Sequence, residues 1–310
     1  MAEGYLTEIS EREHEACRRL LLVPFLSERL FWSLGLQTSF SWFILQFEKE
    51  RVVPSSRGDI DILAGPLTWT DPGAFQSLLS EERANAQPDR HDSWNHQLAA
   101  LTLARAGGIR WPPPVNKLVG VEAKCAYLDP RADRIATETL RSTKSSAAKA
   151  DKIKRQVESL LEMGLDHAVL LDIIANPPVS GPNGGAWISA LAVAAESTYA
   201  MSSILDQRLP KESEAAHWVW SSGAVAGGDE LRRGAGTPVE LRPSRGNSRL
   251  TSISTQLIRA EMEQRLHGLF SKFPTPLVFP AIFVDCKTCG TVHGLPWDDT
   301  VCETTALNRP

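Results

Sequence analysis

Four charged residues in two short apolar segments carry the clearest chemical signal in the sequence. Asp59 and Asp61 lie in RGDIDILAG, and Glu122 and Lys124 lie in KLVGVEAKC. Both segments are short, apolar and rich in β-branched residues, so each is predicted to form a strand. Residues i and i+2 of a strand point to the same face. We therefore expect the two acids of the first strand to share a face, and Glu122 and Lys124 to share a face of the second.

A bound metal ion would explain carboxylates in strands of this kind. The flanking residues are apolar enough for central strands, which seldom hold unpaired carboxylates. A buried carboxylate needs a cation, either a lysine or a metal. Converging carboxylate oxygens suit a hard divalent ion such as Mg²⁺ or Mn²⁺, which binds phosphate oxygens and lowers the pKa of a bound water. The alternative, for either strand alone, is that its charges lie on the solvent side of an edge strand.

The two segments resemble the D…ExK signature of the PD-(D/E)xK, or restriction-endonuclease-like, nuclease superfamily. Asp61 matches the Asp of the pattern, Glu122 the (D/E) and Lys124 the Lys, whereas Ile60 stands in place of the Pro. The resemblance implies a metal-dependent nuclease in which Asp61, Glu122 and Asp59 hold Mg²⁺ or Mn²⁺. In that arrangement Lys124 positions the attacking water or neutralises the growing charge.

The same resemblance implies two further catalytic residues. Many members carry a Gln or Lys on the helix after the ExK strand, and Gln156 takes that place in AAKADKIKRQVESLLEMG. Many members also use a Glu from the first helix. Glu48 is our candidate because it ends the apolar segment 26–46, which is predicted to be mainly helical, and Glu50 and Glu28 are its competitors.

A basic segment follows the ExK strand. Residues 131–155 hold eight Lys or Arg against three acids in a chain whose net charge is −4. Lys and Arg that neutralise phosphates supply most non-specific affinity for nucleic acid. The segment is therefore predicted to contact nucleic acid, unless it is only a solvated helix face. The candidate nucleic-acid-binding residues are Arg141, Lys144, Lys149, Lys152, Lys154 and Arg155.

The order of the predicted elements favours an α/β fold with a central mixed β-sheet flanked by helices. The resemblance places a restriction-endonuclease-like core at residues 1–176, with a polar, Pro-rich insertion at 66–116 that contains one helix. Residues 177–310 are expected to form an α+β extension packed on this core. Within the core, residues 5–21 have apolar residues at helical spacing and are predicted to be a helix.

Composition and charge limit the partners. Of the 310 residues, 42% are hydrophobic and 23% are charged, which is typical of a globular protein. The net charge of −4 excludes a general polyanion binder, so nucleic acid must bind a local patch. There is no apolar run of about 18 residues and no signal-peptide pattern at the N-terminus, so no membrane partner is expected. An odd number of cysteines, five, favours a reducing compartment and a cytoplasmic location.

The C-terminal segment FVDCKTCGTVHG places Cys286 and Cys289 in a CxxCG turn, followed by His293 and later by Cys302. The CxxCG phrase resembles one half of a zinc ribbon. A second CxxC is missing from the sequence. The favoured interpretation is two thiols at the end of a buried strand, where Cys behaves as a small hydrophobe, and hence no structural zinc. A zinc site and a redox pair are the alternatives.

Taken together, these features predict a Mg²⁺-dependent phosphodiesterase that acts on nucleic acid, with DNA as the favoured substrate, in a setting such as restriction or defence against phage. The alternative is a catalytically inactive nuclease-fold protein that binds nucleic acid or a partner protein. The intact Asp61, Glu122 and Lys124 argue against this alternative. The sequence has no helicase or ATPase motif, so such an activity would belong to a separate polypeptide; a homodimer is the other arrangement left open.

Overall fold

One mixed β-sheet organises the protein. The computed structural model describes residues 6–8, 24–128, 145–175, 209–222 and 238–295. The strands of the sheet are β1 (Leu6–Glu8), β2 (Ser41–Glu48), β3 (Asp59–Pro66), β6 (Val119–Leu128), β7 (His167–Ala175), β8 (Ala216–Ser222), β9 (Val239–Arg242), β10 (Ala281–Asp285) and β11 (Val292–Leu295).

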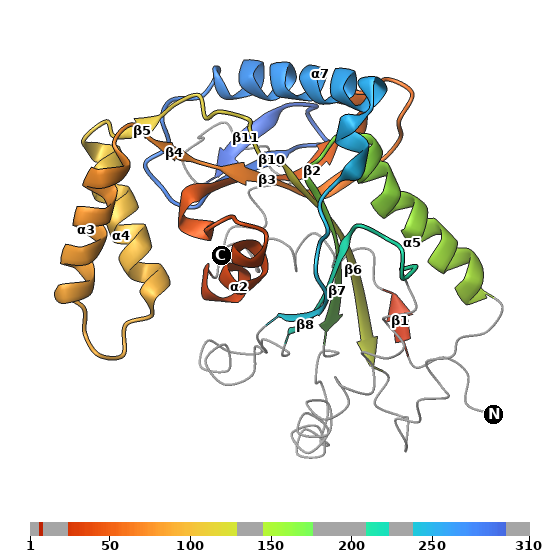
Figure 1. Cartoon of the computed structure of the whole chain (residues 1–310), viewed down its shortest axis with the longest axis horizontal. Coiled ribbons are helices and arrows are strands. Elements are labelled where there is room, and N and C mark those ends of the chain that lie inside the picture. Colours follow the sequence, from red (N-terminus) through yellow and green to blue (C-terminus); the bar gives the residue numbers. More distant parts are fainter. Residues whose placement is uncertain (1–5, 9–23, 129–144, 176–208, 223–237, 296–310) are drawn as a thin grey trace.

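The strand order across the sheet is β11-β10-β2-β3-β6-β7-β8-β9, and β1 pairs with the end of β6 (Figure 1). The pairs β10–β2, β6–β7 and β7–β8 are parallel, and the other pairs are antiparallel. Helices lie against the sheet, so the predicted α/β fold with a central mixed sheet is confirmed.

Residues 24–48 form a helix and a strand, so the prediction of one helical segment at 26–46 was wrong. The helix α2 (Pro24–Ser33) ends just before Gly35, which has a φ of +76° that favours glycine. A short 3₁₀ turn, η1 (Thr38–Phe40), leads into β2. β2 lies between β10 and β3 and is mostly buried, so its sequence SWFILQFE is apolar almost throughout. A continuous apolar run of this kind does not distinguish a strand from a buried helix.

The N-terminal segment also differs from its prediction. Leu6–Glu8 forms the short strand β1, which pairs with Ala126–Leu128 of β6. The predicted helix at 5–21 is therefore wrong at these residues. The remainder of that prediction, residues 9–21, lies outside the described part of the chain.

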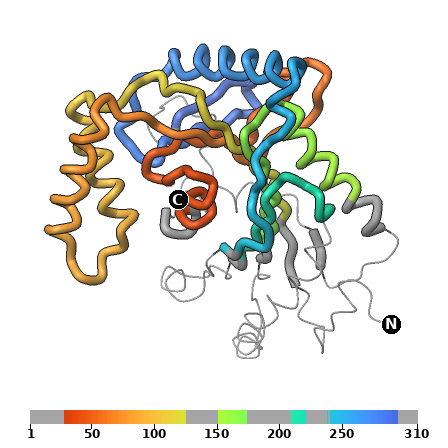
Figure 2. Tube along the Cα trace, in the orientation of Figure 1, coloured from red at the N-terminus to blue at the C-terminus, as the bar shows by residue number. Residues whose placement is uncertain are grey.

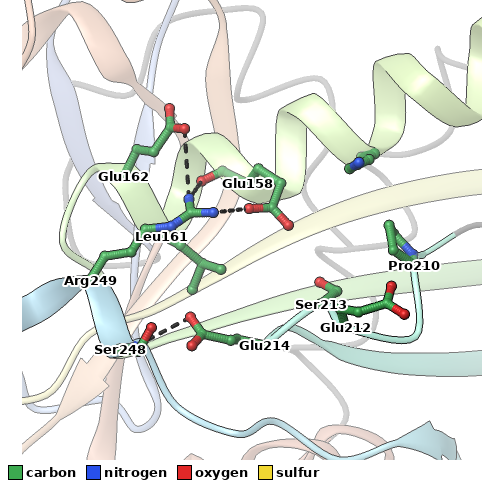
Figure 3. Close-up of a pocket in the computed structure, with 10 residues that line it drawn as sticks. Glu158, Leu161, Glu162, Pro210, Glu212, Ser213, Glu214, Ser248 and Arg249 are labelled. Carbon is green, nitrogen blue, oxygen red and sulfur yellow. Dashed lines mark hydrogen bonds and ion pairs between the residues drawn. The ribbon is translucent and has the colours of Figure 1, made fainter.

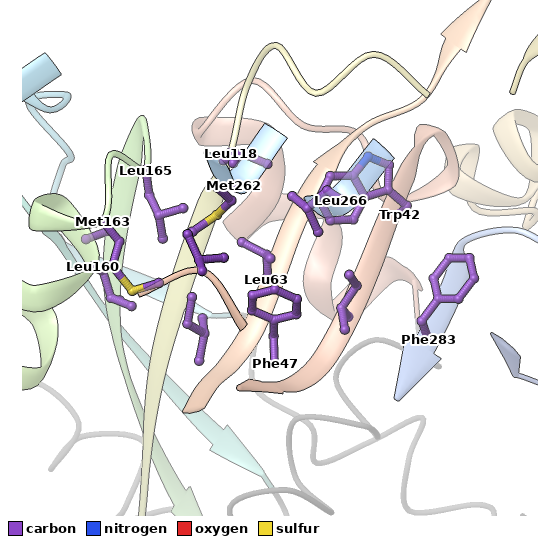
Figure 4. Packing of buried hydrophobic residues seen from close by; sticks show 14 of the residues in the cluster. Trp42, Phe47, Leu63, Leu118, Leu160, Met163, Leu165, Met262, Leu266 and Phe283 are labelled. Carbon is purple, nitrogen blue, oxygen red and sulfur yellow. The ribbon is translucent and has the colours of Figure 1, made fainter. Parts of the chain in front are cut away.

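Helices cover both faces of the sheet. The helices α5 (Ser145–Glu162) and α7 (Ile253–Phe270) pack on one face, and α2 packs on the other. Figure 4 shows the larger core layer, in which Leu160 of α5 and Met262 and Leu266 of α7 meet Leu63 of β3. These side chains are fully buried, so apolar burial holds both helices against the central strands.

The segment between β3 and β6 adds a small two-stranded sheet and two helices to the core. It contains the strands β4 (Thr68–Trp69) and β5 (Ile109–Arg110), which pair with each other, and the helices α3 (Pro72–Ala84) and α4 (Asp92–Arg105). Figure 2 shows the two helices as a hairpin at one side of the molecule. The sequence of this insertion predicted only one of the two helices.

The described residues after 208 extend the same sheet at both ends. β8 and β9 continue it beyond β7, whereas β10 and β11 continue it beyond β2. Within the described ranges, no helix combines the length and the apolar character needed to cross a membrane.

Replacing Gly65 by Ala tests the packing of the central strands. Gly65 lies opposite Trp42, and a Cβ atom there would lie 2.3 Å from the Trp42 ring and 3.0 Å from the Lys117 carbonyl oxygen. Because the Trp42 ring is fully buried, overpacking should lower the free energy of unfolding by about 1–3 kcal/mol. Urea unfolding measures this change.

Gly268→Ala is the matched control for that substitution. A Cβ atom at Gly268, in α7, meets nothing within 4 Å, so alanine should raise stability by up to about 1 kcal/mol through its helix propensity. An unchanged unfolding midpoint in Gly65→Ala would contradict this packing of Gly65 against Trp42.

Candidate functional site

The candidate site lies where β3 and β6 separate. The two strands pair at Ile62–Ala64 and Val119–Val121, and the next residue of β3 towards its N-terminus is Asp61. Its carboxylate Oδ2 accepts a hydrogen bond of 2.6 Å from the backbone amide of Ala123. β1 pairs with β6 only from Ala126 onwards. Ala123 lies between the part of β6 that pairs with β3 and the part that pairs with β1. The Asp61 carboxylate therefore accepts the hydrogen bond of the Ala123 amide in place of a neighbouring strand.

A distortion of β2 accompanies this separation. Gln46 has a φ of +58°, and it is the one residue other than glycine with a positive φ among those the structure describes. It lies opposite Asp61, between the pairs that Leu45 and Phe47 make with β3. In a regular strand, Ile44 and Phe47 would point to opposite faces because they are three residues apart. Both belong to the same core layer, so the alternation of side chains is interrupted at Gln46. A left-handed residue within a strand is strained, and such strain often marks functional sites.

Glu122 and Lys124 lie together on the face of β6 that carries α5. Gly120, two residues before Glu122, faces Leu160 and Leu165, which belong to the core layer under α5. The Lys124 Nζ atom donates hydrogen bonds to Glu122 Oε1 at 2.6 Å and to the Ala123 carbonyl oxygen at 2.9 Å. The Glu122 residue is only 2% exposed, so the lysine neutralises a carboxylate that has little contact with water.

The surroundings of Asp61 perturb its ionisation. Burial raises the pKa of Asp61, and the neighbouring Glu122 charge raises it further, whereas Lys124 and the Ala123 amide lower it. The net result is a pKa of Asp61 of about 8. Asp61 therefore favours its protonated form at neutral pH, and a cation could take the place of that proton.

Lys49 is a second buried cation beside the carboxylates, and it was not predicted from the sequence. It begins the 3₁₀ turn η2 (Lys49–Arg51) after β2, and its Nζ donates a 3.0 Å hydrogen bond to Ser159 Oγ of α5. Burial lowers the pKa of Lys49, while the Glu122 and Asp61 carboxylates oppose that effect. The sequence signal, a lysine directly after an apolar strand, was hidden because β2 was predicted to be helical.

Two buried acceptor atoms, one on Glu122 and one on the covering helix α5, have no hydrogen-bond donor within the described structure. They are Glu122 Oε2 and Gln156 Oε1, and both are buried. Gln156 lies on α5 one turn before Ser159, whose hydroxyl donates to the Gln156 carbonyl oxygen at 2.6 Å. An unsatisfied buried acceptor is costly, so these oxygens favour a cation or another donor at the site. Carboxylate and amide oxygens form the donor set that Mg²⁺ and Mn²⁺ prefer.

Asp59 and Glu48 do not join this pair in the same way. Because β2 is a strand, Glu48 lies opposite Asp59 and not opposite Asp61. The Asp59 carboxylate forms a 2.8 Å ion pair with Lys287, and the Glu48 carboxylate lies 3.9 Å from Arg51. Asp59 still adds negative charge near Asp61, since it contributes to the raised pKa of that residue.

The two competitors of Glu48 also lie elsewhere. Glu28, on α2, is 3.6 Å from His91 of the insertion, and burial raises the pKa of Glu28. Glu50 is exposed on the 3₁₀ turn after β2. The structure thus gives neither residue a described contact with Asp61 or Glu122.

The basic residues of α5 divide between two sides of the helix. Lys152, Lys154 and Arg155 are exposed. Lys149 belongs to α5, but its side chain lies outside the description, as do Arg141 and Lys144 entirely. At 3.6 residues per turn, Lys152 continues the stripe of Gln156 and Ser159.

Lys154 faces different surroundings. It lines a pocket of about 470 Å³ between α5 and the segments around Pro210 and Ser248. Figure 3 shows Glu158 and Glu162 of α5 there, with Arg249 bonded to Glu158 and 3.6 Å from Glu162. The other acids of the pocket are Glu212 and Glu214. None of the candidate catalytic residues lines it, so we expect Lys154 to contribute less to phosphate binding than Lys152.

No protein-family model, curated protein or solved structure matches this chain. The resemblance to PD-(D/E)xK nucleases therefore rests on Asp61, Glu122 and Lys124 and on the segments that contain them. The positions of these residues at the separation of β3 and β6 are the geometric basis for a functional proposal.

Replacing Asp61 by Asn should stabilise the protein in the absence of divalent ions. The folded-state pKa of about 8 lies above the ordinary value of 3.8, so ionisation of Asp61 opposes folding as the pH rises through this window. Asparagine keeps the acceptor for the Ala123 amide and removes the charge. Thermal unfolding in EDTA above pH 8 should shift upwards, by about 2–4 °C for each kcal/mol gained.

Asp71→Asn serves as the control for the loss of one negative charge, because Asp71 is an exposed N-cap residue and asparagine caps equally well. Its midpoint should change little. If Asp61→Asn instead lowers the midpoint at this pH, neither the burial of the Asp61 charge nor its repulsion by Glu122 limits the stability of the protein.

Proposed function

We propose that the protein is a metal-dependent phosphodiesterase that cleaves nucleic acid, with DNA as the favoured substrate. The observation that carries the proposal is the meeting of Asp61 and Glu122 with Lys124 at the separation of β3 and β6. The restriction-endonuclease-like core and the cytoplasmic location implied by the sequence belong to the same proposal.

Asp61 and Glu122 would hold the ion, Mg²⁺ or Mn²⁺. The fit is supported by the raised pKa of Asp61 and by Glu122 Oε2, which has no described donor. When bound, a divalent ion neutralises phosphate oxygens and lowers the pKa of a water bound to it. Asp59 would act in a supporting role, since its carboxylate is paired with Lys287 but its charge still reaches Asp61.

The two lysines would stabilise charge that develops during cleavage. Lys124 shares the face of Glu122, so its ammonium can orient a water or balance charge on a phosphoryl oxygen. Lys49 lies on the α5 side and is held by Ser159. Because burial lowers its pKa, Lys49 gives up a proton more readily than an exposed lysine. We assign Lys124 the direct role and Lys49 a positioning role for the carboxylates.

Gln156 would contact a water or a substrate group. Its amide oxygen is buried without a described donor, on the helix that covers the site. The stripe from Gln156 towards Lys152 would then guide the phosphate backbone to the carboxylates, because lysines bind phosphates without regard to sequence. Glu48, in contrast, is assigned no catalytic role, since it lies opposite Asp59 and near Arg51.

A second candidate function is nucleic-acid or partner binding without cleavage. This function is favoured because lysines of the protein already balance the charge of the carboxylates. Lys124 contacts Glu122 at 2.6 Å, and Lys49 lies near both carboxylates. A network of this kind can exist without an ion. Metal-dependent cleavage separates the two candidates, because only the first requires it.

Glu122→Gln should reduce cleavage of nucleic acid by about 10²-fold or more, because it removes a metal ligand and leaves the fold intact. Lys124→Ala should have a comparable effect, and the losses in the double variant should not add. Initial rates on plasmid DNA, single-stranded DNA and RNA, with Mg²⁺, with Mn²⁺ and with EDTA, provide the measurement.

Glu240→Gln is the matched control, because Glu240 is an exposed acid on β9. It should cleave as the unsubstituted protein does. Activity that survives in Glu122→Gln, or that EDTA does not affect, would exclude the proposed site. Binding of nucleic acid with no cleavage under any of these conditions would favour the second candidate.

Charge reversal on α5 tests the proposed path of the nucleic acid. The triple variant Lys152→Glu, Lys154→Glu, Arg155→Glu should bind DNA more weakly and with a flatter salt dependence. The log–log slope should fall by about 0.9 for each phosphate that the variant no longer neutralises. The affinity for Mg²⁺ should change little. Fluorescence anisotropy over a series of salt concentrations measures both the affinity for DNA and the slope.

The single variants Lys152→Glu and Lys154→Glu form a matched pair on the same helix. Since Lys154 lines the acidic pocket, its reversal should weaken binding less than reversal of Lys152. Unaltered DNA binding in the triple variant would show that this helix face is only solvated.

A further inference from the structure

The hairpin between β10 and β11 brings together three side chains that bind transition metals. Cys286, Cys289 and His293 each offer a ligand atom, and these atoms all lie within 4.8 Å of one another. Cys286 and His293 are each 5% exposed, whereas Cys289 is exposed at the turn. The group is therefore mostly enclosed, with one ligand at the surface.

The backbone of the turn determines this arrangement. The amide of Gly290 donates to the Cys286 carbonyl oxygen at 2.8 Å, and the amide of Cys286 donates to the Thr291 carbonyl oxygen at 2.9 Å. Gly290 has a φ of +69°, a conformation that favours glycine. His293 follows on β11, opposite Val284 of β10. The turn thus reverses the direction of the chain and brings the His293 imidazole close to both sulfur atoms.

The ligand chemistry selects a particular kind of ion. Two thiolates and an imidazole are soft to borderline ligands, which suit Zn²⁺ far better than Mg²⁺ or Ca²⁺. Ligand atoms on a tetrahedral zinc lie about 3.5 Å apart, given Zn–S and Zn–N bonds of about 2.3 and 2.0 Å. Cys289 Sγ is already 3.0 Å from His293 Nε2. Only small side-chain movements would seat an ion between the three groups.

We propose that Cys286, Cys289 and His293 form a structural zinc site. Binding would replace the two thiol protons, which pass to solvent, by two Zn–S bonds, and the imidazole would bind through its neutral nitrogen. A fourth ligand, either water or a further side chain, would complete the tetrahedron. Cys302, considered for this place from the sequence, lies outside the described residues. The proposal replaces the sequence-based expectation of two thiols without zinc.

The ion would hold a turn that is tied to the candidate site. Lys287, between the two cysteines, forms the 2.8 Å ion pair with Asp59. Arg51 donates to both carboxylate oxygens of Asp285 at 2.6 Å and to the Gly290 carbonyl oxygen at 3.0 Å. Zinc would therefore fix the segment that presents Lys287 to Asp59. The zinc proposal itself does not depend on the proposed nuclease activity.

The test is the metal content of the full chain, purified from zinc-supplemented medium without chelator or metal affinity resin. We expect about one zinc per chain by elemental analysis. Cobalt substitution should produce thiolate-to-metal charge-transfer absorption. Cys289→Ser should lose both signals and unfold at a lower temperature, and because Cys289 is exposed this variant is expected to fold.

The control is Cys17→Ser, which removes a cysteine far from the turn in sequence and should keep the zinc. His293→Ala should lose zinc as Cys289→Ser does, with its fold checked by circular dichroism. A zinc content near zero in the unsubstituted protein would overturn the proposal. Full zinc occupancy in folded Cys289→Ser would overturn it as well.

Discussion

The burial of two carboxylates where β3 and β6 separate is the constraint on which the rest of the site depends. Asp61 is held by the Ala123 amide and Glu122 by Lys124, and both acids have little contact with water. Removal of such charges from water is unfavourable unless cations lie close by. The protein places Lys124 on the same strand and Lys49 at the end of β2. A divalent ion bound there would also neutralise the buried carboxylates. The burial of these two acids therefore both lowers the stability of the protein and creates the proposed metal site.

Contacts far from the carboxylates hold the strand that carries them. Arg259 of α7 donates to the Gly164 carbonyl oxygen at 2.8 Å and to Asp166 Oδ2 at 2.7 Å. Asp166 in turn accepts a 2.6 Å hydrogen bond from the amide of Leu118, the residue just before β6. One helix from the C-terminal part of the chain thereby fixes the start of β6 and the loop between α5 and β7. Lys49 depends on α5 as well, through Ser159. The site is thus assembled from elements that are widely separated in the sequence.

The parts of the site that the sequence predicted are those set by local spacing. Side chains of a strand alternate between its two faces, so the spacing of two residues alone places Glu122 and Lys124 on one face. This prediction does not require knowledge of the adjacent strands. Lys49 and Lys287 escaped prediction, since each reaches the acids only through strand pairings that no local pattern reveals. The simple alternation also fails around Asp61, because Ile60 and Ile62 lie in different core layers although the register of β2 with β3 is unbroken. His293 was a candidate zinc ligand from its spacing in the sequence, but its position beside the two cysteines depends on the pairing of β11 with β10.

The two proposed metal sites differ in chemistry, although only β2 separates β10, which leads into the zinc-binding turn, from β3 in the sheet. Asp61 and Glu122 offer hard oxygen ligands, whereas Cys286, Cys289 and His293 offer sulfur and nitrogen, so Mg²⁺ and Zn²⁺ should divide between them by preference. EDTA would remove both ions, and its effect alone therefore does not identify which site supports cleavage. Addition of Mg²⁺ to the stripped protein would refill the oxygen ligands only. Lys287 joins the zinc-binding turn to Asp59. If Mg²⁺ restores only part of the cleavage activity and zinc then restores the rest, the ion in the hairpin contributes to the structure and the ion at the carboxylates contributes to the chemistry.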